Sequence, residues 1–170
     1  MASDGNGTSD SESRIIDVPI ESLPFIDEHT ATVAAPPDAV WRAVLEVVTG
    51  SGAGWATAPI ARALGCIPAE RSGEPGRIGS TVPGFVVTRA VPPAVLALMG
   101  EHRFSRYALV FRIGETLAGP TTVSAETRAE FPGRGGEVYR TLVIRTRGHV
   151  IATKSILRAV RRQAEKRSLA

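Results

Sequence analysis

The sequence predicts a single α+β domain in which an antiparallel sheet packs against one long C-terminal helix. Three observations carry this prediction. A first short strand is followed by two short helices, several strand-like runs lie between positions 77 and 131, and a proline-free amphipathic stretch begins at Gly136. A sheet must bury its apolar face, and the apolar stripe of the last helix is suited to cover it.

Composition narrows the class of protein. The chain has 170 residues, 43% of them hydrophobic and 22% charged, values typical of one globular domain. Its single cysteine, Cys66, excludes an intrachain disulfide and a cysteine-rich zinc site. No apolar run is long enough to span a bilayer, and the polar, acidic start lacks the order of a signal peptide. We therefore expect a soluble, cytoplasmic protein with no cofactor and no metal.

The N-terminal residues are expected to lie outside the domain proper. Residues 1–14 hold almost no side chains that could be buried, and are predicted to be a disordered acidic tail. Residues 15–28 regain hydrophobicity, but two prolines argue against a regular element there. We expect an extended segment that packs on the domain, which itself spans 29–167. Its anchors would be Ile15, Ile20 and Phe25.

Each element follows from local pattern. The β-branched run from His29 to Val33 predicts the first strand, and Asp38 is suited to cap a helix that continues to Thr49. A second short helix is predicted over 55–64. Alternation of polar and apolar residues favours a sheet covered on one side only. The expected strands are 77–82, 85–91, 94–103, 107–114 and 121–131.

The run from His29 to Trp41, HTATVAAPPDAVW, resembles the opening of the START/Bet v 1-like superfamily, also called SRPBCC. Members often begin with a strand followed by Ala-Pro-x-x-x-Val-Trp and a helix. The order of the later elements is similar to the same layout over 28–167. The resemblance implies a helix-grip fold, in which a curved antiparallel sheet wraps around the C-terminal helix. It also implies a cavity between them for lipids, polyketides or other apolar molecules. The superfamily has no common catalytic motif, so no catalytic residue is carried over.

Two histidines are candidates for the wall of such a cavity. His29 shares the strand face of Ala31 and Val33, and His149 lies in the apolar stripe of the last helix, seven residues after Leu142. Each candidate has an alternative interpretation: hydrogen-bonded core residues for the histidines, packing in the core alone for the aromatic residues, and an exposed helix residue for Arg145. The predicted cavity residues are His29, Trp41, Trp55, Phe85, Tyr107, Phe111, Tyr139, Arg145, Thr146 and His149.

Charged residues on the strands leave two questions open. Strand alternation allows either His102 or its neighbours Glu101 and Arg103 to face inward. Glu126 and Arg128 alternate with apolar residues, so we interpret them as cross-strand pairs on the solvent face. Cys66 has no activating histidine nearby in sequence and is interpreted as a structural thiol.

Three functional hypotheses follow. The first is binding of a small apolar or amphipathic molecule between sheet and last helix. The second is an enzyme of the cyclase or aromatase kind that uses the same cavity. The third is an interaction protein, because residues 133–170 hold ten Lys or Arg against two Glu, whereas 1–28 are strongly acidic. We expect no specific nucleic-acid partner and at most weak contact with a membrane surface. Monomer and homodimer remain open. The basic face consists of Arg140, Arg147, Lys154, Arg158, Arg161 and Arg162.

Overall fold

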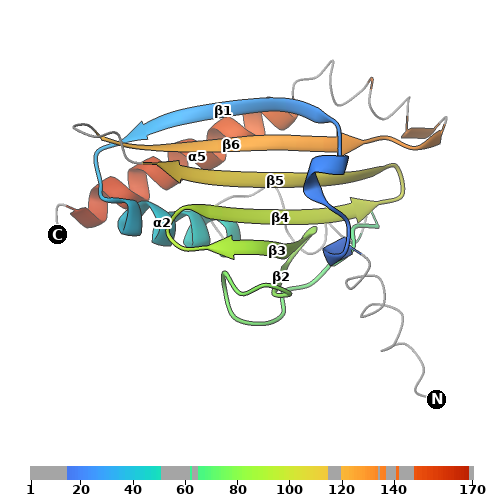
Figure 1. Ribbon diagram of the computed structural model, residues 1–170, viewed down its shortest axis with the longest axis horizontal. Coiled ribbons are helices and arrows are strands. Elements are labelled where there is room, and N and C mark those ends of the chain that lie inside the picture. Colours follow the sequence, from blue (N-terminus) through green and yellow to red (C-terminus); the bar gives the residue numbers. More distant parts are fainter. Residues whose placement is uncertain are drawn as a thin grey trace.

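The computed structural model describes residues 15–50, 62, 65–114, 120–133, 135–136, 141 and 148–168. They contain an antiparallel six-stranded sheet in the order β1-β6-β5-β4-β3-β2. The helices α2 (Pro37–Thr49) and α5 (Gly148–Ser168) lie on one face, called the inner face below (Figure 1). The predicted α+β helix-grip fold is thereby confirmed. The strands are β1 (Phe25–Val33), β2 (Thr81–Val82), β3 (Phe85–Val91), β4 (Val95–His102), β5 (Ser105–Gly114) and β6 (Thr121–Glu130).

Helix α2 begins directly after a pair of prolines. Pro36 is the N-cap residue with an extended backbone, and Pro37 lies in the first turn, where its missing N–H is tolerated. The prediction that Asp38 caps this helix is therefore wrong. The negative charge of Asp38 in the first turn still favours the helix. One side of α2 is buried against the sheet and α5. It consists of Ala39, Val40, Trp41, Ala43, Val44 and Val47.

Helix α5 runs along β1 in the same direction and is held to it at both ends. Nε2 of His149 lies 3.2 Å from Oδ2 of Asp27 near the start of β1. At the other end, the backbone N–H of Ala34 donates to Oε1 of Glu165 over 3.2 Å. Seven strand residues and sixteen helical residues both span about 24 Å. The helix and the strand therefore match in length between these two contacts.

The main core lies between the inner face and the two helices. Leu98, Leu109 and Phe111 come from the central strands, and Leu157 and Val160 come from α5. The predicted apolar stripe of the last helix is thus confirmed over its described part, where Thr153 and Ile156 are also buried. Burial at about 25 cal/mol per Å² makes this contact the main stabilising term.

The outer face is partly covered as well, which corrects the prediction of a sheet covered on one side only. Ile15 and Leu23, from the segment before β1, pack on three outer-face residues. These three residues are Val86, Met99 and Ala108. The alternation of polar and apolar residues could not predict the covered patch, because these three apolar residues share the outer face with charged residues.

The segment 15–24 differs in detail from the extended chain that was predicted. It contains a short 3-10 turn, η1 (Ile20–Ser22), and β1 already begins at Phe25 rather than at His29. The strand can start there because the carbonyl of Pro24 accepts a hydrogen bond from Ala129. As a result Phe25 is 57% exposed instead of packed on the domain. Of the strand predicted over 77–82, only Thr81–Val82 forms.

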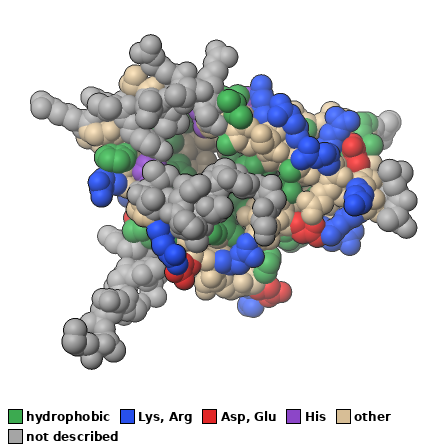
Figure 2. All heavy atoms as spheres, turned by 180° about the vertical axis from the view of Figure 1, so that it is seen from behind, with side chains coloured by type: hydrophobic (Ala, Val, Ile, Leu, Met, Phe, Trp, Pro, Cys, Tyr) green, Lys and Arg blue, Asp and Glu red, His purple; other side chains and the backbone are tan. Residues whose placement is uncertain are grey.

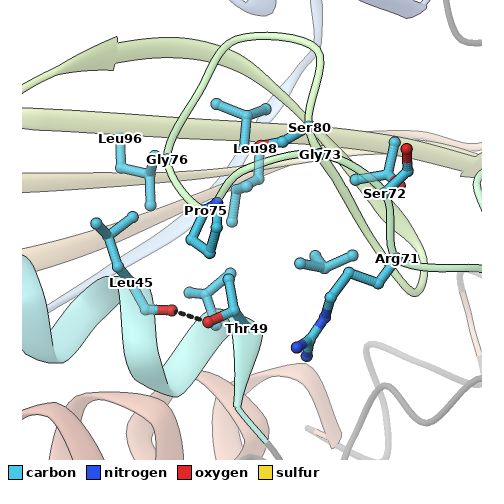
Figure 3. Close-up of a pocket in the computed structure, with 14 residues that line it drawn as sticks. Leu45, Thr49, Arg71, Ser72, Gly73, Pro75, Gly76, Ser80, Leu96 and Leu98 are labelled. Atoms are coloured by element: carbon cyan, nitrogen blue, oxygen red, sulfur yellow. Dashed lines mark hydrogen bonds between the residues drawn. The ribbon is translucent and has the colours of Figure 1, made fainter.

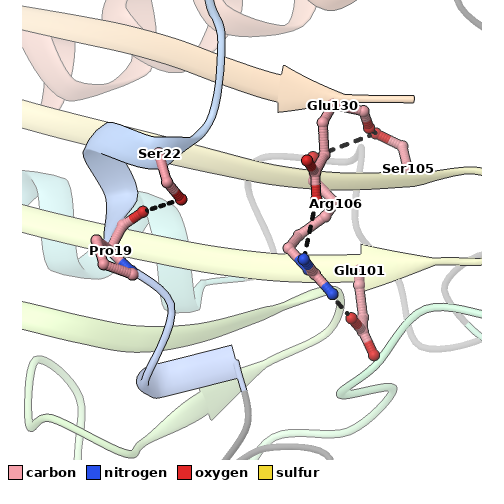
Figure 4. Close-up of polar contacts among 6 residues, drawn as sticks. All are labelled: Pro19, Ser22, Glu101, Ser105, Arg106 and Glu130. Atoms are coloured by element: carbon pink, nitrogen blue, oxygen red, sulfur yellow. Dashed lines mark hydrogen bonds and ion pairs between the residues drawn. The ribbon is translucent and has the colours of Figure 1, made fainter. Parts of the chain in front are cut away.

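Ion pairs occupy the remainder of the outer face. Nη1 of Arg106 lies 2.9 Å from Oε1 of Glu130, and its Nε lies 3.5 Å from Oε2 of Glu101 (Figure 4). Glu126 and Arg128 were predicted to form cross-strand pairs on the solvent face. Glu126 does pair across the strands, with Nη1 of Arg112 at 3.0 Å, but it also contacts Arg128 of its own strand, and its carboxylate is buried.

The end of the segment 15–24 is tied to the sheet through Arg128. Its guanidinium donates to the backbone carbonyl of Leu23 over 2.9 Å. Within the segment, the hydroxyl of Ser22 donates to the carbonyl of Pro19 (Figure 4). The tail over 1–14 and nearly all of the helix predicted over 55–64 lie outside the described residues. The last helix is described from Gly148, so most of its predicted first part from Gly136 lies outside as well.

Replacement of Gly100 by alanine should severely destabilise the protein. The carbonyl oxygen of Gly84 occupies the inner-face space over Gly100, only 1.9 Å from the position of an added Cβ, and the Tyr107 ring lies at 3.0 Å. We expect a loss of about 3 kcal/mol or more in the free energy of unfolding, measured by urea titration. Gly114→Ala is the matched control, since its Cβ would meet only ordinary contact at 3.5 Å. Equal stability of the two variants would contradict this packing.

Removal of the Glu126 carboxylate should cost about 2 kcal/mol of stability, because Arg128 and Arg112 would lose a shared, buried partner. The control is Glu130→Ala. Both members of the Arg106–Glu130 pair have side chains 39% exposed, so its loss should cost less than about 1 kcal/mol. Chemical denaturation of both variants measures the difference. A smaller loss for Glu126→Ala than for Glu130→Ala would contradict the assigned burial.

Candidate functional site

The inner face changes character toward the start of β1. Strand register places Asp27 opposite Thr127, and Tyr107 opposite both Ala129 and Gly100. His102 follows Gly100 on the same face of β4, two residues further along. This half of the face therefore carries acid, imidazole and hydroxyl groups, whereas the other half is apolar. We call it the polar half of the inner face.

A three-residue cluster lies at the β1 side of the polar half. Oδ2 of Asp27 is 3.1 Å from Nε2 of His29 and 3.2 Å from Nε2 of His149. Asp27 and His29 share one face of β1 because they are two residues apart, and α5 brings His149 over them. Each of the three side chains is about one-fifth exposed. Two imidazoles thus converge on one carboxylate oxygen at a position that solvent can reach.

The cluster is costly for stability. Oδ1 of Asp27, Nδ1 of His149 and Oγ1 of Thr127 are buried without a hydrogen-bond partner among the described residues. A buried polar atom left unpaired costs about 1–3 kcal/mol. Apolar side chains such as those of Val33 and Ala125 would fill the same face without this cost. Such a local violation of packing rules is expected where a site serves function.

A second group lies across the polar half, on β4 and β5. The hydroxyl of Tyr107 donates to the carbonyl of Gly84 over 2.9 Å, and the ring of Phe85 packs edge-on against it at 5.1 Å between centroids. The imidazole of His102 lies 5.5 Å from the Tyr107 ring. Two strand spacings, about 10 Å, separate β1 from β5. The two groups therefore lie on either side of β6, whose Thr127 and Ala129 share the inner face with them.

Burial changes the acid–base properties of this second group. It lowers the pKa of His102, so the neutral imidazole is favoured. Nδ1 of His102 accepts a hydrogen bond from the backbone N–H of Phe104 over 3.1 Å, which suits that neutral form. Burial also raises the pKa of the Cys66 thiol, and a hydrogen bond with Tyr107 offsets part of this. The predicted role of Cys66 as an inert structural thiol agrees with this direction.

The structure brings four of the predicted cavity residues to the polar half: His29, Phe85, Tyr107 and His149. Phe85 also belongs to the main core, together with Trp41 and the fully buried Phe111. The remaining four lie outside the described residues. They are Trp55, Tyr139, Arg145 and Thr146.

Sequence reasoning did not include Asp27 among the site residues, because β1 was expected to begin at His29. A strand extended to Phe25 would have placed Asp27 and His29 on one face by period two. Strand alternation in the sequence left the orientation of His102 open, and the structure resolves this orientation. His102 faces inward, while Glu101 pairs with Arg106 on the outer face.

An apolar hollow lies elsewhere on the inner face, between α2, the loop 71–76 and β4 (Figure 3). Leu45, Leu96 and Leu98 point into it, and Thr49 bonds back to the carbonyl of Leu45 at 2.7 Å. The free space is about 10 Å³, which is room for about one water molecule. This hollow is therefore packing space and not a ligand site.

Basic side chains gather on the helix-bearing side. Figure 2 views that side and shows histidines beside hydrophobic side chains in one part of it, and Lys and Arg side chains over another. A groove of about 570 Å³ between α2 and α5 is lined by three basic residues, Arg71, Arg162 and Lys166, and by the acidic Glu46. Lys154, Arg158 and Arg161 are exposed as predicted, whereas Arg140 and Arg147 lie outside the described residues. Among the described helices, none is long and apolar enough to cross a membrane.

Comparison with solved structures identifies the fold. The di-domain ARO/CYC protein StfQ from the steffimycin biosynthetic pathway matches with a TM-score of 0.56 and 15% identity, over 85% of this chain and 52% of StfQ. The chain thus spans about half the length of StfQ. At this identity the likeness concerns the fold alone. The chain shares the fold of StfQ, which agrees with the helix-grip arrangement that the resemblance of the opening motif implied.

Two further solved structures are similar at lower TM-scores. CalU16 from Micromonospora echinospora matches at 0.48 with 16% identity, over 87% of this chain and 92% of CalU16. The Polyketide_cyc-like protein Cgl2372 from Corynebacterium glutamicum matches at 0.47 with 16% identity, over 80% of this chain and 88% of its own. No protein-family model matches the sequence, and no curated protein matches it.

His102 should make the protein less stable as the pH falls. Since burial lowers the pKa of His102 in the folded state, the unfolded chain binds the proton more readily, and stability is lost below the ordinary histidine pKa of about 6.5. Between pH 7.5 and pH 5, the urea midpoint of the wild type should therefore fall by more than the urea midpoint of His102→Gln. Urea titration at both pH values measures it. A His102 ring that titrates by NMR at or above its ordinary value would contradict the assignment.

Proposed function

We propose that the protein binds a small apolar or amphipathic molecule on the polar half of the inner face. The observation that carries the proposal is the convergence of the His29 and His149 imidazoles on Oδ2 of Asp27, at 3.1 and 3.2 Å, next to the apolar half of the same face. A ligand site commonly combines apolar walls with a few polar groups that fix orientation. Phe85, Tyr107 and Ala129 supply the apolar part of this arrangement.

The fold supports the same proposal. Folds of this kind place a sheet face opposite a long helix, and ligand sites lie between such layers. StfQ, which shares the fold, is described as an ARO/CYC protein. The unpaired polar atoms around Asp27 are an additional support, because their cost of stability needs an explanation outside packing.

A second candidate function is acid–base catalysis of the cyclase or aromatase kind. It requires at least two titratable groups that converge in the site, and Asp27 with two imidazoles meets this requirement. Recovery of the bound molecule after incubation distinguishes the two functions. A carrier returns it unchanged, whereas an enzyme returns a product of altered mass. The hypothesis of a basic interaction surface stays a prediction, with the groove at Arg71, Arg162 and Lys166 as its structural basis.

Native mass spectrometry of the purified protein, followed by solvent extraction, should reveal a small molecule of low polarity. A neutral fluorescent probe, N-phenyl-1-naphthylamine, should compete for the same site. Ala129→Leu should weaken probe binding at least fivefold, because Ala129 lies opposite Tyr107 on the inner face. Its control is Ser124→Leu on the outer face of the same strand. An empty protein that also fails to bind the probe would contradict the proposed function.

A further inference from the structure

The two imidazoles of the cluster have their hydrogens fixed by Asp27. A carboxylate oxygen only accepts hydrogen bonds, so Nε2 of His29 and Nε2 of His149 must each carry a hydrogen toward Oδ2 of Asp27. In a neutral imidazole with a hydrogen on Nε2, Nδ1 is an acceptor. In the neutral form of each ring, Asp27 therefore leaves Nδ1 as the nitrogen that can receive a hydrogen bond.

The two acceptor nitrogens differ in access. Nδ1 of His149 is buried and has no partner among the described residues. No hydrogen bond to Nδ1 of His29 occurs within the described part of the chain, and the His29 side chain is 21% exposed. Because Nδ1 of His149 is buried, we infer that Nδ1 of His29 is the nitrogen that meets a bound molecule.

We propose that His29 is the specificity-determining residue of the site, and that it selects molecules that present a hydroxyl to Nδ1. Asp27 and His149 are positioning residues: Asp27 fixes the ring of His29, and His149 holds Asp27. The inference rests on the proposed function. The ligand class is then an apolar body with a hydroxyl hydrogen-bond donor, such as a phenol, rather than an ether or a carboxylate. A carboxylate would also be repelled by Asp27.

A metal ion is a poorer explanation of the same cluster. No group of three metal-binding side chains with suitable geometry occurs among the described residues. In addition, a metal-bound histidine usually donates its second N–H to a partner, whereas Nδ1 of His149 has none. Hydrogen bonding to a ligand hydroxyl needs no such partner at His149.

The test uses a matched pair of probes with the full chain. 2-Naphthol donates a hydrogen bond, and 2-methoxynaphthalene keeps the oxygen but cannot donate. One hydrogen bond contributes about 0.5–1.5 kcal/mol net, which corresponds to a preference of roughly twofold to twelvefold for 2-naphthol. Calorimetry of wild type should show this preference, and His29→Phe should abolish it while binding of 2-methoxynaphthalene remains.

Asp27→Asn provides a variant of nearly unchanged shape. The amide of an asparagine can donate to Nε2 of His29, which would place the hydrogen on Nδ1 and turn the acceptor into a donor. The preference for 2-naphthol should then disappear or reverse. Glu28→Gln, an exposed neighbour on the opposite strand face, is the control and should keep the preference. Nitrogen NMR shifts of His29 report the position of its hydrogen in each variant.

The outcomes separate the two proposals. Equal affinity of wild type for both probes would overturn the role of His29 but leave the binding function intact. Absence of binding for either probe would contradict the proposed function itself. Stoichiometric zinc binding that is lost in His29→Phe would overturn the hydrogen-bonding role in favour of a metal site. A hydrogen found on Nδ1 of His29 in the wild type would also overturn it.

Discussion

The pairing of α5 with β1 is the constraint on which the rest of this structure depends. The helix lies along the strand between the contacts of His149 with Asp27 and of Glu165 with Ala34. Between these ends, Ile156, Leu157 and Val160 cover the inner face and form the core with α2. The same alignment brings an imidazole from the helix to a carboxylate on the strand, so the contact that closes the core also builds the cluster.

The inner face is divided between stability and chemistry. Near the C-terminal end of β1 it is apolar and covered, which makes burial the dominant stabilising term. Near its N-terminal end it carries Asp27, Thr127 and His102, and some polar atoms there have no hydrogen-bond partner in the described part of the chain. Polar groups of this kind lower stability, and the apolar half offsets their cost. Two features stabilise the outer face of the sheet. They are the ion pairs of Glu126 with Arg112 and Arg128 and the packing of the segment 15–24.

Comparison of sequence and structure shows where local patterns are informative. The strand Phe85–Val91 was predicted with its observed bounds, since prolines end it and alternation defines it. The inward orientation of His29 followed from Ala31 and Val33 on the same face. The start of β1 was wrong by four residues, because Pro24 was taken to break the strand, whereas its carbonyl still pairs with Ala129. That error removed Asp27 from the predicted site.

The sequence by itself determined the α+β class, the order of elements and the likeness of its opening motif to the START/Bet v 1-like superfamily, because these depend on local periodicity and on proline and glycine positions. It also identified His29 and His149 as separate candidates. Only the tertiary structure decided that both approach Asp27, a residue 122 positions before His149. It also decided that Nδ1 of His149 is buried with no hydrogen-bond partner among the described residues. Distances between residues far apart in the chain depend on how the helix packs on the sheet, and no local pattern contains that information.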